Sequence, residues 1–214
     1  MTLLILARHG NTFEPGQQAV WVGARSDLPL TSKGREQAAA LGRALLHAGL
    51  APARTITGPL RRTRETASIA IAEAGGSPEQ IEIDERLREI DYGAWEGKSS
   101  DDIRLEGAGA ELHAWETDGV WPANAGWPSS REAYLQSLAG VLRSVRESRR
   151  EPSLIVSSNG LFRLLAGALA GPTFAGKMAT GRLALLRLPG EDEAQILGWN
   201  LSPDAFPAFV AERL

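Results

Sequence analysis

Short apolar runs alternate with helical segments along most of this chain, and this alternation constrains the fold more than any other feature. Buried strands are predicted at 3–7, 54–57 and 153–157, each followed by a turn and, further along, a helix. An edge strand at 81–83 and two final strands at 183–188 and 195–200 complete the set. The pattern predicts an α/β fold, a three-layer sandwich in which a mainly parallel sheet has helices on both faces.

Length and composition indicate one ordinary globular domain, residues 1–214, with an inserted cap. The chain is 43% hydrophobic with a net charge of −3, so nothing favours nucleic acid or an anionic membrane as a partner. It contains no cysteine, which excludes disulfides and thiolate metal sites. The first apolar run is too short for a signal peptide or a membrane span, and we expect a cytoplasmic protein.

Turn and capping residues mark the ends of the predicted helices. Thr31 is a candidate N-cap for a helix that continues to about His47, and Pro59 suits the first turn of a second helix. Ser129 or Ser130 caps a third helix, which extends to about residue 146. A fourth helix is predicted at 161–169, directly after a polar turn.

Residues 99–131 are weakly periodic and rich in glycine, proline and tryptophan. A long irregular segment within a compact domain is usually functional or mobile. We therefore predict a cap over a crevice, with Trp115, Trp121 and Trp127 facing a leaving group with apolar surface. The alternative is that these rings only cover the core.

The first strand leads directly into Arg8-His9-Gly10, and ligands bind beyond the carboxyl ends of strands in open α/β sheets. Arg8 offers a forked donor to phosphate or carboxylate. His9 could be a base, a metal ligand or a nucleophile, or an ordinary residue at a solvated strand end.

The second helix begins with three arginines, at 61, 62 and 64, where the helix dipole is already positive. Such a placement serves either a solvated face or the binding of an anion, and only one arginine can point directly into the crevice. The stretch 87–97 interleaves acids with aromatic and glycine residues. An acid beside apolar rings can have a raised pKa and donate a proton, although a loop of solvated carboxylates remains the alternative.

Two other chemistries fit poorly. The stretch 156–160 lacks the first glycine of a G-x-S-x-G nucleophile turn, and every histidine precedes Ser158 rather than following it. The three histidines are widely spaced without a metal-ligand signature, so we expect no metal site.

Four motifs in order resemble the histidine phosphatase superfamily, whose members include phosphoglycerate mutase-like proteins. They are Arg8-His9-Gly10-Asn11-Thr12 with the stretch 23–34, Pro59–Ala67, Leu87–Gly97 and Gly198-Trp199-Asn200. The resemblance implies that His9 is a nucleophile forming a phosphohistidine and that Glu89 protonates the leaving oxygen and then activates water. It implies phosphate-binding roles for Arg8 and Arg62, joined by Asn11, Ser158 and Asn159.

One departure from the family pattern concerns the turn after the strand at 153–157. Family members usually carry a second histidine in a pattern like V-S-H-G, and here Ser158 stands in its place. A neutral donor replaces a charged one, which weakens contact with the phosphoryl group. His113 in the cap is a candidate replacement, and otherwise a surface residue.

The resemblance leaves three functions to distinguish. The first is a phosphatase acting on a small phosphorylated substrate without a cofactor. The second is a weak or inactive module that binds a phosphate ligand, and the third is a phosphoglycerate-type mutase. Mutases of the family carry a basic pair in the insertion, whereas residues 105–130 contain no lysine or arginine, which favours the phosphatase. The sequence leaves open whether the protein forms a homodimer.

Overall fold

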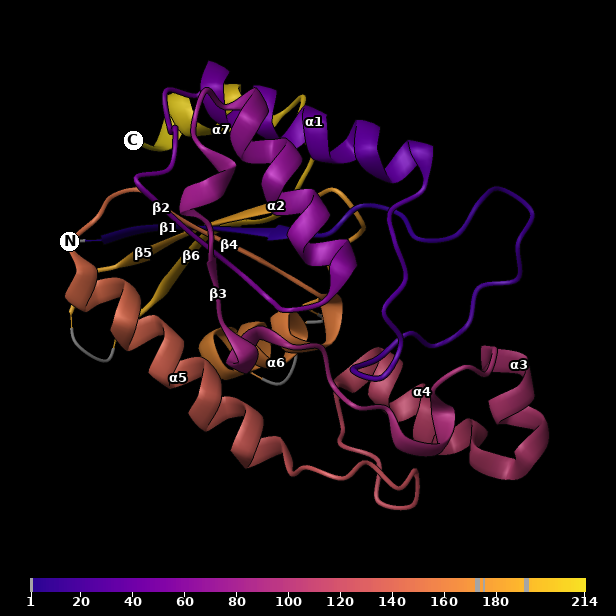
Figure 1. The fold of residues 1–214 in the computed structure, drawn as a ribbon. Helices are drawn as coiled ribbons and strands as arrows, with labels where there is room; N and C mark the ends of the chain where they lie inside the picture. The colour runs from indigo at the N-terminus through magenta and orange to yellow at the C-terminus, as the bar shows by residue number, and fades with distance from the viewer. Residues whose placement is uncertain (1, 172–173, 175, 191–192) are drawn as a thin grey trace.

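The computed structural model describes residues 2–171, 174, 176–190 and 193–214. Its centre is a six-stranded sheet in the order β3-β2-β4-β1-β5-β6 (Figure 1). The strands are β1 (Thr2–Arg8), β2 (Arg54–Thr57), β3 (Glu82–Ile83), β4 (Ser153–Ser157), β5 (Leu183–Leu188) and β6 (Gln195–Leu201). The first four are mutually parallel, whereas β5 is antiparallel to β1 and β6 is antiparallel to β5. The predicted α/β fold with a mainly parallel sheet is confirmed.

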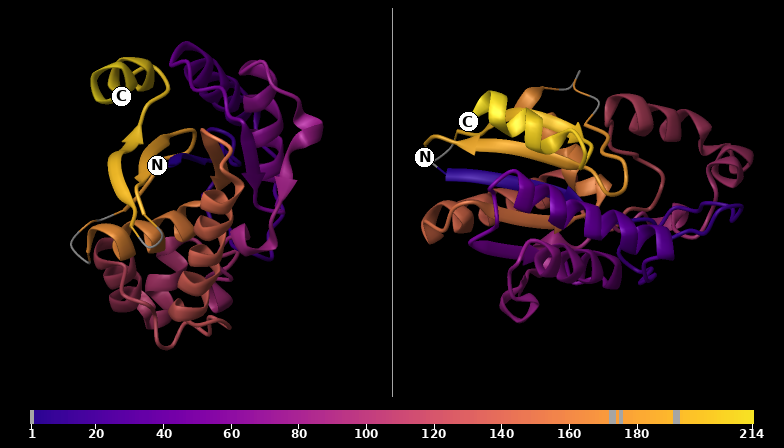
Figure 2. Two further views of the ribbon diagram at one scale, coloured as in Figure 1. Left: turned by 90° about the vertical axis from the view of Figure 1, so that its left-hand side faces the viewer. Right: turned by 90° about the horizontal axis from the view of Figure 1, so that it is seen from above.

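Helices cover both faces of the sheet, as Figures 1 and 2 show. The helices are α1 (Ser32–His47), α2 (Arg61–Glu73), α3 (Ser100–Ile103), α4 (Gly109–Asp118), α5 (Arg131–Ser148), α6 (Asn159–Ala170) and α7 (Phe206–Arg213). Apolar side chains of α1, α2 and α7 pack on one face, beside Ile5 and Val156. Those of α5 and α6 pack on the other, beside Leu4 and Ile155. Alternate residues of β1 and β4 thus face opposite layers, as expected of a central strand.

The predicted capping residues are largely confirmed. The Thr31 side chain accepts a hydrogen bond from Gly34 N at 3.1 Å, and that of Ser130 accepts one from Ala133 N at 3.2 Å. The second helix begins at Arg61, two residues after Pro59, without a side-chain cap. The capping hydrogen bonds accepted by Thr31 and Ser130 satisfy backbone donors that have no partner within the helix.

Strand register brings three chain segments to one edge of the sheet. Arg8 of β1 pairs with Ser157 of β4, and Thr57 of β2 pairs with Val156 of β4. The turns that follow β1, β2 and β4 therefore leave the sheet side by side. Residues that the sequence separates by up to about 150 positions meet at this edge.

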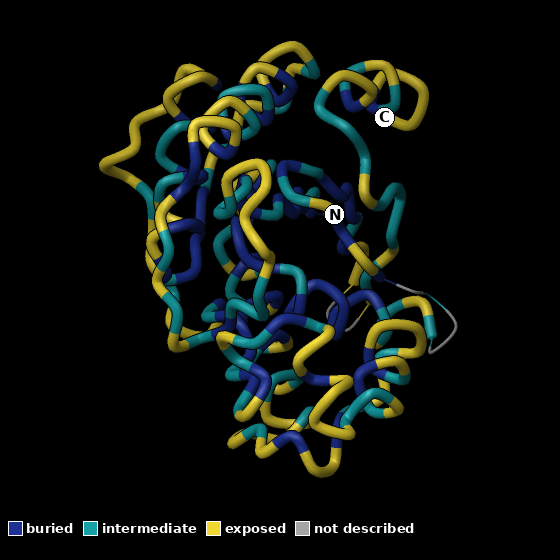
Figure 3. The backbone as a smooth tube through the Cα atoms, turned by 90° about the vertical axis from the view of Figure 1, so that its right-hand side faces the viewer, coloured by how far each residue is buried: buried dark blue, intermediate teal, exposed yellow. Residues whose placement is uncertain are grey.

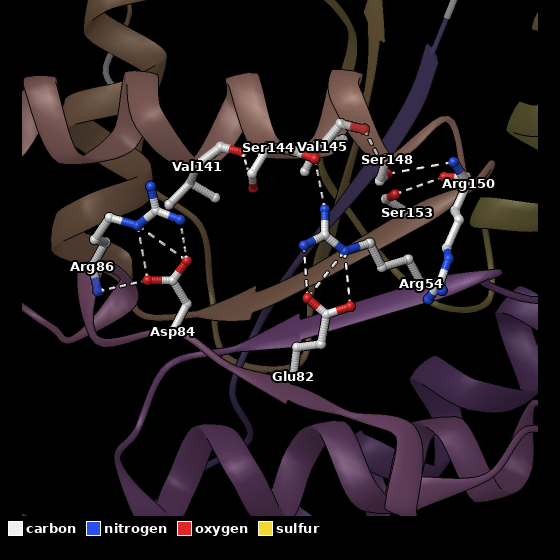
Figure 4. Close-up of polar contacts among 10 residues, drawn as sticks. All are labelled: Arg54, Glu82, Asp84, Arg86, Val141, Ser144, Val145, Ser148, Arg150 and Ser153. Carbon is white, nitrogen blue, oxygen red and sulfur yellow. Dashed lines mark hydrogen bonds and ion pairs between the residues drawn. The ribbon is translucent and has the colours of Figure 1, made fainter.

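Charged side chains form ion pairs at and next to β3, the outermost strand on one side of the sheet, as Figure 4 shows. Arg54 forms an ion pair with Glu82 of β3 at 2.6 Å and donates to the Ser144 carbonyl of α5 at 2.7 Å. Asp84 forms a second pair with Arg86 at 2.6 Å. The contacts of Arg54 attach a two-residue edge strand to its neighbour and to a helix, whereas the Asp84–Arg86 pair is local to the turn after β3.

The segment 99–131 is more regular than its sequence suggests. Ser100–Asp118 is helical, comprising α3, a π-helical stretch (Arg104–Ala108) and α4, whereas 119–130 holds neither helix nor strand. Gly107 interrupts the helical path with φ of 91°, which breaks any long periodicity. The segment lies at one end of the molecule, and Figure 3 shows its mixture of buried and exposed backbone.

The tryptophans of this segment pack against other aromatic rings. Trp127 makes edge-to-face contacts with Trp121, Trp115 and Trp95, with ring centroids 4.6, 5.1 and 5.4 Å apart. Trp21 from the loop after β1 also contacts Trp95, at 5.4 Å. Such contacts favour the alternative in which these rings cover the core, and they attach the segment firmly to the domain.

Gly42 provides a test of the layer formed by α1 and α2. A Cβ atom at this position would overlap the Ala70 carbonyl of α2. We expect Gly42→Ala to lower the free energy of unfolding by about 1–3 kcal/mol, because overpacking outweighs the better helix propensity of alanine. Urea denaturation measures the change.

Gly167 in α6 is the matched control, because a Cβ there would meet nothing within 4 Å. Gly167→Ala should leave stability unchanged or raise it by up to about 1 kcal/mol. Equal effects of the two substitutions would contradict close packing between α1 and α2.

Candidate active site

His9 lies just beyond β1 and is the centre of the site. Its backbone N–H donates to the Ser157 carbonyl at 3.1 Å, and the residue is only 6% exposed. Nδ1 lies 2.8 Å from the Gly10 carbonyl and must donate to it, which leaves a lone pair on Nε2. Burial, together with Arg8 and Arg62, holds the pKa of His9 well below its usual range. The imidazole is therefore neutral at pH 7.

Arg62 is the arginine of the α2 start that points inward. It is 1% exposed, and its two amino groups donate to the carbonyls of Ser26 at 2.7 Å and Gly23 at 3.2 Å. Arg61 instead forms an exposed pair with Glu65 at 2.6 Å. Within the described part of the chain only neutral carbonyls accept from this buried guanidinium, so it keeps its positive charge near His9.

Arg8 also donates to a backbone carbonyl. Its Nη1 donates to the Met178 carbonyl at 2.6 Å. The Nε atoms of Arg8 and Arg62 are both buried, and neither has a hydrogen-bond partner among the described residues. Two cations with unused donors next to a neutral imidazole form a strongly electropositive site.

The segment 178–180 before β5 completes the site, and no motif in the sequence pointed to it. Asn159 Oδ1 accepts from Met178 N at 2.9 Å, and Asn11 Oδ1 accepts from the Thr180 hydroxyl. Each amide oxygen is thus occupied, and each amide NH₂ remains available as a donor. This short stretch carries neither a glycine-rich turn nor a charge that could have marked it.

Glu89 reaches the site from the loop after β3. Its Oε1 accepts from Ile90 N at 2.8 Å and its Oε2 from Gly160 N at 3.1 Å. It is 4% exposed, and burial raises the pKa of its carboxyl. A Cβ at residue 160 would overlap both Glu89 and the Tyr92 hydroxyl, so glycine is needed where α6 begins.

Ser158 follows β4 and lies next to His9 by register, since Arg8 and Ser157 are partners. It is fully buried, and its hydroxyl has no hydrogen-bond partner within the described part of the chain. The hydroxyl does not cap α6, although Ser158 holds the N-cap position. A free hydroxyl at this depth is an unused donor beside the imidazole.

These groups open into a pocket of about 450 Å³. Of the predicted residues, Arg8, His9, Asn11, Glu89 and Asn159 line it, whereas Arg62 and Ser158 are not among its described lining residues. The other lining residues are Thr12, Phe13, Ala19, Val20, Trp21, Val22, Tyr92, Ser100, Glu116 and Thr180.

The cap contributes differently from the prediction. Ser100 and Glu116 represent it in the pocket, while its three tryptophans are absent from the described lining. His113 is exposed on α4 and is not among the described lining residues either. The expectation of an apolar tryptophan wall from the cap is therefore not supported, and the apolar wall comes from the loop after β1.

Within the described residues, no three acidic or histidine side chains are grouped as a metal site would require. No described helix is long and apolar enough to cross a membrane.

Comparison with known proteins gives the family. The model of the histidine phosphatase superfamily (branch 1) matches residues 4–201. The chain belongs to this superfamily. Glucosyl-3-phosphoglycerate phosphatase of Mycolicibacterium vanbaalenii is 31% identical over 176 residues, which cover 78% of this chain and 74% of the relative. A 2,3-bisphosphoglycerate-dependent phosphoglycerate mutase of a Methylobacterium species is also 31% identical, covering 80% and 82%.

Solved structures support the same relationship. The native structure of a mycobacterial glucosyl-3-phosphoglycerate phosphatase has a TM-score of 0.78 and 25% identity, covering 94% of this chain and all of the other. Superfamily relatives are thus phosphatases and mutases, and enzyme function on phosphorylated small molecules is supported at this level.

The proton of His9 can be observed directly. We expect long-range ¹H–¹⁵N spectra to show His9 with the proton on Nδ1 and to show it neutral well below pH 6.5. Its pKa is lowered by folding, so the folded form resists protonation, and stability is lost as the pH falls below the unfolded value. His9→Gln identifies the resonance. An imidazolium at pH 6 would contradict this electrostatic description.

Proposed function

We propose that the protein is a phosphatase that hydrolyses a small phosphomonoester through a phosphohistidine on His9. The observation that carries the proposal is the free Nε2 of a buried, neutral imidazole beside Arg62, which is buried, and Arg8, which is half-buried. A neutral nitrogen is the nucleophilic form, and two cations stabilise the negative charge that spreads over a phosphoryl group.

In the first step, Nε2 attacks phosphorus and the bond to the ester oxygen breaks. Arg8 and Arg62 bind the phosphoryl oxygens, and the free amide groups of Asn11 and Asn159 add neutral donors. Preorganised donors of this kind reduce the barrier because they need not reorient during reaction.

Glu89 supplies the proton that the leaving oxygen needs. Burial raises the pKa of Glu89, which favours the protonated carboxyl, while backbone hydrogen bonds hold it in place. In the second step, the carboxylate takes a proton from water, the water attacks phosphorus, and phosphate leaves His9. The acid and base roles thus alternate on one residue.

Residues 99–131 form the substrate cap in this proposal. Ser100 and Glu116 support it, because both line the pocket that holds His9. The absence of lysine and arginine from 105–130 favours a phosphatase over a mutase, which must hold a second acidic group.

Ser158 takes the position of the family's second histidine in this proposal. Its unused buried hydroxyl supports a direct contact with a phosphoryl oxygen. A neutral hydrogen bond stabilises less than a charged one, so turnover is expected to be slow rather than absent. The competing function is a module that binds phosphate ligands without turnover.

The phosphoenzyme is the direct test. We expect rapid quenching of the protein with a ³²P-labelled phosphomonoester at pH 6 to trap acid-labile label on His9, located by peptide mapping. His9→Ala should abolish both label and turnover, because no other histidine lines the described pocket.

His47→Ala is the matched control, since His47 lies exposed in the last turn of α1. It should retain labelling. Saturable phosphate binding with no label across a broad panel of esters would exclude the phosphatase and leave the binding module.

Changes at Ser158 test its contact with the phosphoryl group. We expect Ser158→Ala to lower kcat by up to about tenfold, the equivalent of one neutral hydrogen bond. It should leave the melting temperature nearly unchanged, because the hydroxyl has no described partner in the free protein. Ser158→His should raise kcat if the larger ring is accommodated. An unchanged kcat in Ser158→Ala would show that the hydroxyl does not touch substrate.

A further inference from the structure

The pocket is divided chemically into two parts. Its floor holds the groups that the proposed reaction uses, including Arg8, His9 and Glu89. Away from the floor, Glu116 is the one charged side chain among the described lining residues. This outer part would contact the leaving alcohol, so Glu116 is placed to select it.

Glu116 has a fixed backbone. Arg163 of α6 donates from Nη2 to the Glu116 carbonyl at 3.0 Å and to the Trp115 carbonyl at 2.5 Å. Arg163 is 8% exposed, and its guanidinium lies 5.0 Å from the centre of the Trp115 ring. The last turn of α4 is therefore attached to the helix whose first residue, Asn159, lines the same pocket.

An aromatic and apolar wall completes the outer part. It comes from the loop after β1 and consists of Phe13, Ala19, Val20, Trp21 and Val22. Trp21 donates from Nε1 to the Ser100 hydroxyl at 3.2 Å and contacts the Tyr92 ring edge-to-face at 5.0 Å. Its ring is thus held at the pocket by a hydrogen bond and by packing.

A second anionic group on the substrate would lack a partner here. Arg8 is the only arginine or lysine among the described lining residues, and the proposed reaction uses it for the phosphoryl group. Arg104 lies outside that lining, half-exposed, with Nη2 3.9 Å from Glu116 and Nη1 donating to Asp101 at 2.8 Å. A carboxylate in the outer part would instead meet the like charge of Glu116.

We propose that the substrate is a phosphomonoester of an amino alcohol, with its cationic nitrogen between Trp21 and Glu116 and with no second acid. Aromatic rings attract ammonium groups, and Glu116 adds a negative charge to the lining of the same pocket as Trp21. Glu116 is then a specificity-determining residue. This inference rests on the proposed phosphatase function and adds the class of leaving group. The proposed substrate differs from the phosphoglycerate esters in the names of the relatives, because those esters carry a carboxylate.

Three esters of similar size separate charge from shape. They are phosphocholine, its neutral isostere 3,3-dimethylbutyl phosphate, and the anionic 3-(phosphonooxy)propanoate. We expect kcat/KM for phosphocholine to exceed that for the neutral ester by about fivefold to tenfold, since a partly exposed charge contact contributes modestly. The anionic ester should be the poorest substrate.

Substitution of Glu116 should change this order. We expect Glu116→Gln to lower kcat/KM for phosphocholine to about the value for the neutral ester, so that the preference is lost. Glu116→Arg should make the anionic ester the best of the three. Asp118→Asn is the matched control, since Asp118 lies on the same helix but lines a separate cavity with Trp121 and Arg131. It should keep the wild-type order.

The outcomes distinguish this proposal from the one on which it rests. Equal kcat/KM for the three esters, or preference for the anionic one, would overturn the substrate class while leaving the phosphatase intact. If no ester is turned over, calorimetric dissociation constants measure the same order. Binding that favours phosphocholine through Glu116 would then support the substrate class and reject catalysis, and equal binding would reject both.

Discussion

The placement of buried Arg62 and half-buried Arg8 beside one imidazole is the constraint on which the rest of this structure depends. Removing a guanidinium from water costs several kcal/mol unless other groups replace its hydration. Arg62 recovers part of this through the carbonyls of Gly23 and Ser26, and Arg8 through Met178. Carbonyl groups solvate these cations without neutralising them, so the site remains prepared for an anion.

The same field sets the chemistry of its neighbours. Burial and the positive charges of Arg8 and Arg62 disfavour a further positive charge on the imidazole. They therefore keep His9 neutral and able to act as a nucleophile. The arginines also favour the charged form of Glu89, but burial outweighs them and raises its pKa. Burial thus lowers the pKa of His9 and raises that of Glu89, because it disfavours the charged form of each group.

Much of this arrangement could be predicted from the sequence. Apolar runs bounded by turn residues indicated the parallel strands, and parallel strands bring their carboxyl ends to one edge, which is why Arg8-His9 and Ser158-Asn159 meet. Spacing on α2 placed Arg61 and Arg64 together, but it could not say which face was inside. Which face of α2 is buried depends on the hydrogen bonds from Arg62 to the carbonyls of Gly23 and Ser26, which lie far from it in the sequence.

Other features had no local signal. The stretch 178–180 meets the site only because β5 enters the sheet beside β1, so its backbone carbonyl reaches Arg8. The tryptophans of the segment 99–131 are not among the described lining residues of the pocket, which favours the alternative that they cover the core. Mutual edge-to-face packing of large rings buries more apolar surface than exposure in a pocket would, and Trp115 is accordingly 2% exposed.

The position of the cap follows from its attachments rather than from its own sequence. Arg163 belongs to α6, and α6 starts at the turn that holds Asn159 and the amide of Gly160 bound to Glu89. The first turn of α6 therefore holds Glu89 through Gly160, and its second turn holds the Glu116 backbone through Arg163. The distance between the part of the pocket at His9 and the part at Glu116 is thus set by a single helix. A site of this kind can change its leaving-group preference through side chains of α4 while the geometry around His9 stays constant.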